Sequence, residues 1–126
     1  MNEKETYKKV LDRLFDGLKT EKHDKFKNDR LAERKFAVDD LYPDIILTKK
    51  DSKTIEFMIE IVVNEHISRT ALLQKWLPLS KKGPTYYLLV PKLKLKQVEK
   101  LCDDQKMQVR YGTYEIKQDK VEIKFF

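Results

Sequence analysis

The chain has 126 residues, of which 38% are charged and 40% hydrophobic, and its formal net charge is +6. This length predicts a single domain, residues 1–126, with a core of its own. The lone cysteine, Cys102, excludes an internal disulfide and a cysteine-rich zinc site, and it favours a reducing, cytoplasmic location. We expect no membrane span, because no apolar run approaches about 18 residues, and no signal peptide, because the first residues lack an apolar stretch.

The first half of the chain predicts one helix followed by three strands. Residues Glu3–Leu18 form the clearest helix, because apolar residues recur at helical spacing, namely Tyr7, Val10, Leu11, Leu14, Phe15 and Leu18. Thr20–Arg30 is charged and irregular, which predicts an exposed connection with some helix. The period then changes to that of strands at Arg34–Asp40, Asp44–Thr48 and Thr54–Val63. The last of these is almost continuously apolar, which is typical of a central strand buried on both faces.

A second helix and a short strand follow. Ser68 is a suitable N-cap for a helix that runs through Leu79, with Trp76 in the core. Pro78 is expected to kink or shorten the last turn of that helix. Thr85–Val90 is apolar throughout most of its length, which predicts a buried strand.

The remainder of the chain predicts a lysine-rich helix and a hairpin. The helix begins at Pro91 and runs through Gln105, with Cys102 facing inward, and the hairpin consists of Met107–Ile116 and Lys120–Phe126. The strand-helix-strand crossover in the middle of the chain implies a parallel strand pair. We therefore expect an α/β fold, with a mixed sheet and flanking helices in the order helix, three strands, helix, strand, helix, two strands.

Two acids lie inside these strand patterns. Asp44 begins its strand directly after Pro43, which fixes the direction of the chain there. Glu60 is flanked by apolar residues on the predicted central strand, where a buried carboxylate is costly unless it is paired or binds a metal. Magnesium prefers oxygen ligands and keeps several waters, so one or two carboxylates suffice to hold it. Two carboxylates on neighbouring strands therefore point to a divalent cation, and phosphodiester hydrolysis is one reaction that needs such a cation.

The Pro43-Asp44 pair, the Glu60-Ile61-Val62 segment and the order of the elements together resemble the PD-(D/E)XK nuclease superfamily. The resemblance covers nearly the whole chain as architecture, although the motif itself is short. It implies the restriction-endonuclease-like fold, in which helices flank a mixed sheet in three layers. It also implies that Asp44, Glu60 and the backbone carbonyl of Ile61 hold Mg²⁺ or Mn²⁺, and that the protein is an endonuclease that cuts DNA.

The chain departs from that superfamily at Val62, where the resemblance implies a lysine that orients the attacking water. A valine cannot do this, and the loss of a preorganised charge lowers a rate by roughly 10²–10³-fold. Lys75, on the following helix, is either a replacement for that lysine or a solvated helix residue. Two hypotheses therefore stay open. The chain is a magnesium-dependent nuclease with Asp44, Glu60 and Lys75 as catalytic residues, or a degenerate nuclease-fold module that binds nucleic acid or a protein partner without cutting.

Most of the positive charge falls in one segment. Between Ser80 and Lys100 the only acid is Glu99, against six lysines. A localised excess of this kind is typical of a protein that binds a polyanion, and a solvated lysine-rich surface is the alternative. The candidate phosphate contacts are Lys81, Lys82, Lys92 and Lys94. DNA is the expected partner, and a homodimer or a place in a larger complex stays open.

Further polar residues are secondary candidates. Glu3 lies along the apolar stripe of the first helix, and Glu65 follows Glu60 by five positions, so each is either a further metal acid or a residue at a helix end. His66 is predicted at the surface near the start of a helix. Of Tyr86 and Tyr87, which alternate on one strand, at least one is expected in the core and the other is free to stack on a base.

Overall fold

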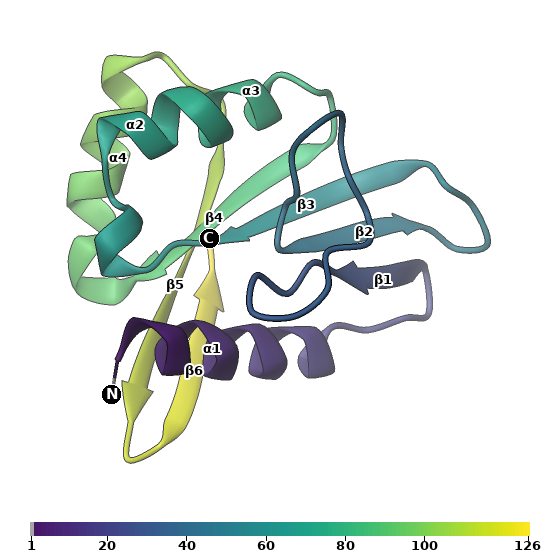
Figure 1. The fold of residues 1–126 in the computed structure, drawn as a ribbon, viewed down its shortest axis with the longest axis horizontal. Coiled ribbons are helices and arrows are strands. Elements are labelled where there is room, and N and C mark those ends of the chain that lie inside the picture. Colours follow the sequence, from purple (N-terminus) through teal and green to yellow (C-terminus); the bar gives the residue numbers. More distant parts are fainter. Residues whose placement is uncertain (1) are drawn as a thin grey trace.

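Six strands form one mixed sheet in a computed structural model that describes residues 2–126 (Figure 1). Their order in the sheet follows the chain, and they are β1 (His23–Lys27), β2 (Ile45–Lys49), β3 (Ile55–Ile61), β4 (Thr85–Pro91), β5 (Arg110–Lys117) and β6 (Lys120–Phe125). The pairs β3–β4 and β4–β5 are parallel, while β1–β2, β2–β3 and β5–β6 are antiparallel. The predicted α/β class with a mixed sheet is confirmed.

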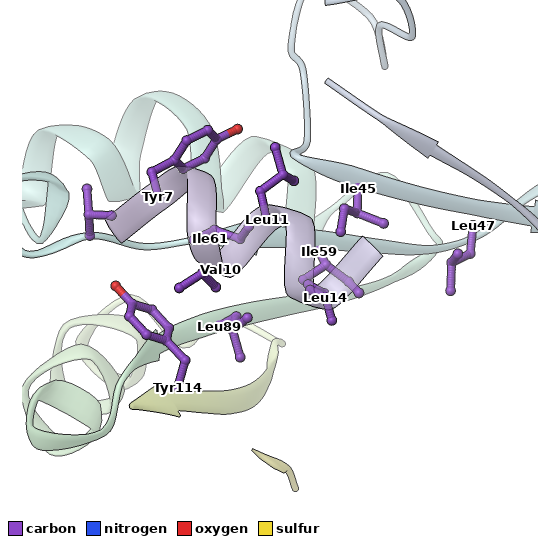
Figure 2. Close-up of a cluster of buried hydrophobic side chains, with 11 residues drawn as sticks. Tyr7, Val10, Leu11, Leu14, Ile45, Leu47, Ile59, Ile61, Leu89 and Tyr114 are labelled. Atoms are coloured by element: carbon purple, nitrogen blue, oxygen red, sulfur yellow. The ribbon is translucent and has the colours of Figure 1, made fainter. Parts of the chain in front are cut away.

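Helix α1 (Glu3–Gly17) covers one face of the sheet. Asn2 caps it, because its side-chain oxygen accepts a hydrogen bond from the Glu5 N–H at 2.8 Å. Figure 2 shows how the predicted apolar stripe packs against the strands, and the buried members of this cluster are Tyr7, Val10, Leu11, Leu14, Ile45, Leu47, Ile59, Ile61, Val63, Leu89 and Tyr114. Fully burying a side chain of this size stabilises a fold by about 1.5–3 kcal/mol, so this packing holds α1, and Tyr7 with it, firmly against the sheet.

The opposite face is covered by a helical stretch and by a final helix (Figure 1). The elements are α2 (Arg69–Ala71), the π-helical turn η2 (Leu72–Trp76), α3 (Leu77–Ser80) and α4 (Leu95–Asp104). Ser68 caps the stretch as predicted, because its Oγ accepts from the Ala71 N–H at 3.1 Å. Pro78 lies in the first turn of α3, directly after the π turn. A proline removes one hydrogen bond from the ladder, which accounts for an irregular turn at this point rather than an end to the helix.

Several core predictions are confirmed. Trp76, Cys102 and Tyr86 are buried in the cluster on this second face. Tyr87 is half-buried, and its ring meets that of Phe125 edge-on with 5.3 Å between the ring centres. The two tyrosines therefore divide as expected, with one in the core and one partly open to solvent.

The first strand does not form where the sequence predicts it. Arg34–Asp40 is a loop, so that prediction was wrong, and β1 forms instead within the segment predicted as an exposed connection. β1 is an edge strand, which tolerates polar residues on its outer side. The ammonium groups of Lys25 and Lys27 lie 4.5 and 5.0 Å from the ring centre of Phe15, so both lysines make cation–π contacts with this ring on α1.

Two short 3₁₀ turns follow the parallel neighbours β3 and β4. They are η1 (Asn64–His66) and η3 (Lys92–Lys94), so the helix predicted from Pro91 begins later, at Leu95. Because β3 and β4 are parallel, both turns lie at the same end of the sheet, beyond the carboxyl ends of these strands. This is the end at which α/β proteins usually bind ligands. In the described part of the chain, every helix is too short or too polar to cross a membrane.

Candidate active site

The two predicted acids lie side by side, one just before a strand and the other on the neighbouring strand. Asp44 directly precedes β2 and Glu60 lies on β3, and the residues are 0% and 2% exposed. Ile45 pairs with Ile59 across the two strands, and the backbone N–H of Ile61 donates to Asp44 Oδ2 at 2.7 Å. Strand pairing therefore brings the two carboxylates together.

Arg30, which no sequence pattern predicts, lies between these acids. Its Nη2 is 2.7 Å from Asp44 Oδ2, 2.9 Å from Glu60 Oε2 and 2.7 Å from the carbonyl oxygen of Ile61. Its Nε also donates to Asp44 Oδ1 at 3.0 Å. Burial works against the charged guanidinium, yet the carboxylates of Asp44 and Glu60 hold the pKa of Arg30 above its ordinary value. The three oxygens that the resemblance implies as metal ligands thus converge on one nitrogen.

Hydrogen bonds from Asn28 fix the loop that carries Arg30. The buried amide of Asn28 donates to the carbonyls of Phe36 and Pro43 at 2.7 and 2.8 Å. Its oxygen accepts from the N–H groups of Lys35 and Phe36 at 2.9 and 2.8 Å. All four hydrogen-bonding positions of the side-chain amide are therefore filled. The loop is an ordered part of the fold that presents Arg30 to the acids.

Tyr7 of α1 supports both Arg30 and Asp44. Its hydroxyl donates to Asp44 Oδ1 at 2.7 Å and accepts from the backbone N–H of Arg30 at 3.2 Å. The guanidinium carbon of Arg30 lies 4.5 Å from the centre of the Tyr7 ring, a cation–π contact. Burial, followed by the Asp44 charge, raises the pKa of Tyr7. A residue of the predicted apolar stripe, Tyr7, therefore also belongs to the cluster of polar residues around Asp44 and Glu60.

Lys75 is the second base of the cluster. It lies on the π turn η2, and its Nζ is 2.7 Å from Glu60 Oε2. Its side chain is 27% exposed, so the structure favours a place beside the acids over a fully solvated position. Val62, where the resemblance implies a lysine, is buried, and its backbone carbonyl accepts from the Tyr114 hydroxyl at 2.8 Å.

The charges of Arg30 and Lys75 balance those of the two acids. Burial, followed by the Asp44 charge, raises the pKa of Glu60 to about 7, whereas Lys75 and Arg30 act in the opposite direction. The hydroxyl of Tyr86 lies 3.4 Å from Glu60 Oε1. Removal of either base would leave one carboxylate without its counter-charge, which is strongly unfavourable because these groups are buried.

The donor set suits a hard divalent cation. Two carboxylate oxygens and one carbonyl oxygen, from Asp44, Glu60 and Ile61, point at a shared position. Oxygens of this kind are the ligands that Mg²⁺ and Mn²⁺ prefer. That position is taken by Nη2 of Arg30, so the oxygens fit a metal only when the guanidinium lies elsewhere. Across residues 2–126, no three His, Cys, Asp or Glu side chains are grouped to hold a metal, so an ion here would depend on the carbonyl and on water for its other ligands.

A cavity of about 490 Å³ opens beside Arg30. Glu3, Glu65 and His66 are among its lining residues, and Glu3 Oε1 accepts from the N–H of Glu65 at 3.3 Å. His66 is exposed as predicted, yet its Nδ1 lies 3.1 Å from Arg30 Nη1. Partial burial of the ring, followed by the Arg30 charge, lowers the pKa of His66, which favours a neutral ring that accepts from the guanidinium.

The four candidate lysines fall into two pairs at opposite ends of β4. Lys81 and Lys82 precede this strand of seven residues, and Lys92 and Lys94 follow it in η3. A strand of that length spans about 23 Å. Lys82 forms an ion pair with Asp39 in the Arg34–Asp40 loop. The Lys92–Lys94 pair lies at the end of the sheet where β3 and β4 both finish, which is the end nearer the acids.

Neither a scan against protein-family models nor searches of curated proteins and of solved structures return a match to this chain. The resemblance to nucleases therefore rests on the sequence motifs that carry it.

Proposed function

We propose that this protein is a metal-dependent nuclease that hydrolyses phosphodiester bonds in DNA. The observation that carries the proposal is that oxygens of Asp44, Glu60 and the Ile61 carbonyl converge on one position, which a positively charged group, Arg30 Nη2, fills. Lys75 Nζ lies 2.7 Å from Glu60 beside it. These three oxygens would hold Mg²⁺ or Mn²⁺. The ion, when bound, supplies Lewis acidity towards the phosphate and lowers the pKa of a bound water.

The protein's own groups would position the reaction. Tyr7 and the Ile61 N–H each donate to Asp44 at 2.7 Å, so its carboxylate is held in one orientation. Lys75 would take the place of the lysine absent at Val62, because its partly exposed ammonium can donate to a water or to charge that develops on the phosphate.

Cleavage assays test this proposal directly. We expect the wild type to cut plasmid, branched or single-stranded DNA with Mg²⁺ or Mn²⁺, and Asp44→Asn and Glu60→Gln to abolish cutting. Both substitutions keep the size of the side chain. Glu56→Gln is the matched control, because Glu56 lies on the same strand but pairs with His23, and it should cut like the wild type. Cutting that survives in both Asp44→Asn and Glu60→Gln would contradict the proposal.

A nuclease-fold module that binds nucleic acid or a protein partner without cutting is the second candidate. Arg30 favours it, because the guanidinium already neutralises Asp44 and Glu60, and the valine at position 62 favours it too. This candidate is expected to bind DNA and leave every substrate intact with either metal. Binding without cutting by the wild type would replace the first candidate by this one.

We expect DNA affinity to depend more on Lys92 and Lys94 than on Lys81 and Lys82. The first pair lies at the end of the sheet nearer the acids. Each lost phosphate contact lowers the slope of log affinity against log salt concentration by roughly one unit. The double change of Lys92 and Lys94 to glutamine should therefore weaken binding and reduce that slope by roughly 2. The same change at Lys81 and Lys82 is the matched control. Fluorescence anisotropy titrations at several salt concentrations measure both, and equal losses would place the DNA across both ends of β4.

A further inference from the structure

Arg30 stands where a divalent cation would have to bind. Its Nη2 lies 2.7, 2.9 and 2.7 Å from oxygens of Asp44, Glu60 and Ile61. A bound Mg²⁺ lies about 2.0–2.1 Å from its oxygen ligands, so an ion shared by these three oxygens would lie close to the place of this nitrogen. The guanidinium and a metal ion therefore exclude one another.

Two buried acids need a counter-charge whichever cation supplies it. Asp44 is fully buried and Glu60 nearly so, and an unpaired buried carboxylate is strongly unfavourable. Lys75 contacts Glu60 alone, whereas Arg30 contacts both acids. Without Arg30 the pair is one positive charge short, and a divalent cation in the same place would make up that loss.

The loop gives Arg30 a fixed backbone and leaves its head group room to move. Asn28 anchors the loop with four hydrogen bonds, and the Arg30 N–H donates to the Tyr7 hydroxyl at 3.2 Å. The side chain of Arg30 is 22% exposed, and it lines the cavity of about 490 Å³ together with His66. The guanidinium can therefore leave the acids for this cavity without unfolding the loop.

We propose that Arg30 is an internal counter-ion that competes with a divalent metal for Asp44, Glu60 and the Ile61 carbonyl. The wild-type chain then binds metal weakly, and loss of the guanidinium uncovers a stronger site. The inference rests on the proposed function only in taking these three oxygens as the ligand set. Arg30 is then a positioning residue, which sets the metal affinity of the site by pairing with the two acids that would bind the metal.

Calorimetric titration with Mn²⁺, together with the melting temperature at rising Mn²⁺ concentration, tests this inference. We expect Arg30→Gln to bind Mn²⁺ about tenfold or more tightly than the wild type, since the two acids lose their main competing cation. Arg34→Gln, which removes an arginine from the same loop, is the matched control for loss of one positive charge and should bind like the wild type. Adding Asp44→Asn to Arg30→Gln should abolish the gain.

A second variant keeps the test decisive if Arg30→Gln is unstable. Arg30→Lys retains the positive charge and so protects the fold, but its ammonium lacks the forked donors of a guanidinium, and a gain of about threefold is expected. Arg30→Gln that folds only on addition of Mn²⁺ supports the inference, because metal binding then supplies folding energy. Equal Mn²⁺ affinity of the wild type and of whichever Arg30 variants fold would overturn it.

The metal titration separates this inference from the proposed function. Tight Mn²⁺ binding by Arg30→Gln, with no DNA cut by any form of the protein, would support the counter-ion role of Arg30 and contradict the proposed nuclease function. DNA cutting by a wild type whose Mn²⁺ affinity equals that of Arg30→Gln would do the reverse.

Discussion

Asp44→Ala is expected to lower the free energy of unfolding by about 3–5 kcal/mol, because it removes one partner of a buried ion pair. Arg30 donates to both oxygens of this carboxylate, at 3.0 and 2.7 Å. The Tyr7 hydroxyl and the Ile61 N–H would also lose their acceptor, and an unsatisfied buried donor costs about 1–3 kcal/mol. Asp44 is therefore the residue through which α1, the Arg30 loop and β3 are tied together.

Urea unfolding followed by circular dichroism measures this loss. Asp44→Asn should cost a similar amount, because it also removes the charge that pairs with the Arg30 guanidinium and turns an NH2 group toward groups that are themselves donors. Asp12→Ala is the matched control on α1, since Asp12 is a partly exposed acid that pairs with Lys8 one turn away and with Lys27, and it should change stability by less than about 1 kcal/mol. A loss of under about 1 kcal/mol for Asp44→Ala would contradict the buried network around this residue.

The two acids could be predicted because the signal for each is local. Asp44 follows a proline at the start of an apolar run, and Glu60 interrupts a run of isoleucine, methionine and valine. A charge in such a place is costly, so its presence indicates a partner. What the sequence does not contain is the identity of that partner, since a metal ion and a guanidinium satisfy the same oxygens.

Arg30 and Tyr7 could not be predicted because their contacts are long-range. Arg30 reaches Asp44 and Glu60 across 14 and 30 positions of the chain, from a charged segment with no periodicity. Tyr7 fits the apolar stripe of its helix and is buried there, so its pattern gives no sign of the hydroxyl's partners. The one available signal is Asn28-Asp29, a pair of residue types that fix loops through their own backbone and side-chain hydrogen bonds.

The misplaced strand has a related cause. Arg34–Asp40 alternates apolar and polar residues, yet Asn28 engages the backbone at Lys35 and Phe36 and holds the segment as a loop. His23–Lys27 carries little apolar signal, and it becomes a strand because β2 offers it a free edge. Pairing with a neighbouring strand decides both segments, and a window of a few residues does not contain that information.

If the protein is the nuclease proposed above, Lys75→Ala is expected to lower the rate of DNA cleavage by roughly 10²–10³-fold, the usual effect of removing one preorganised charge from a reaction centre. Its Nζ lies 2.7 Å from Glu60, and it reaches this position from the π turn η2, a kind of turn that often marks functional sites. Single-turnover kinetics at saturating metal measure the effect. DNA affinity should change little, because Lys75 is one of many positive charges on the chain.

Two controls separate catalysis from structure at this position. Gln74→Ala alters the exposed neighbour on the same turn and should cut like the wild type. Lys75→Arg keeps a cation beside Glu60 and should restore part of the lost rate. If Lys75→Ala cuts at the wild-type rate, the lysine serves only as the second counter-charge of Glu60. The proposed reaction would then depend only on the metal that Asp44, Glu60 and the Ile61 carbonyl would hold, since Val62 offers no group that could replace the lysine.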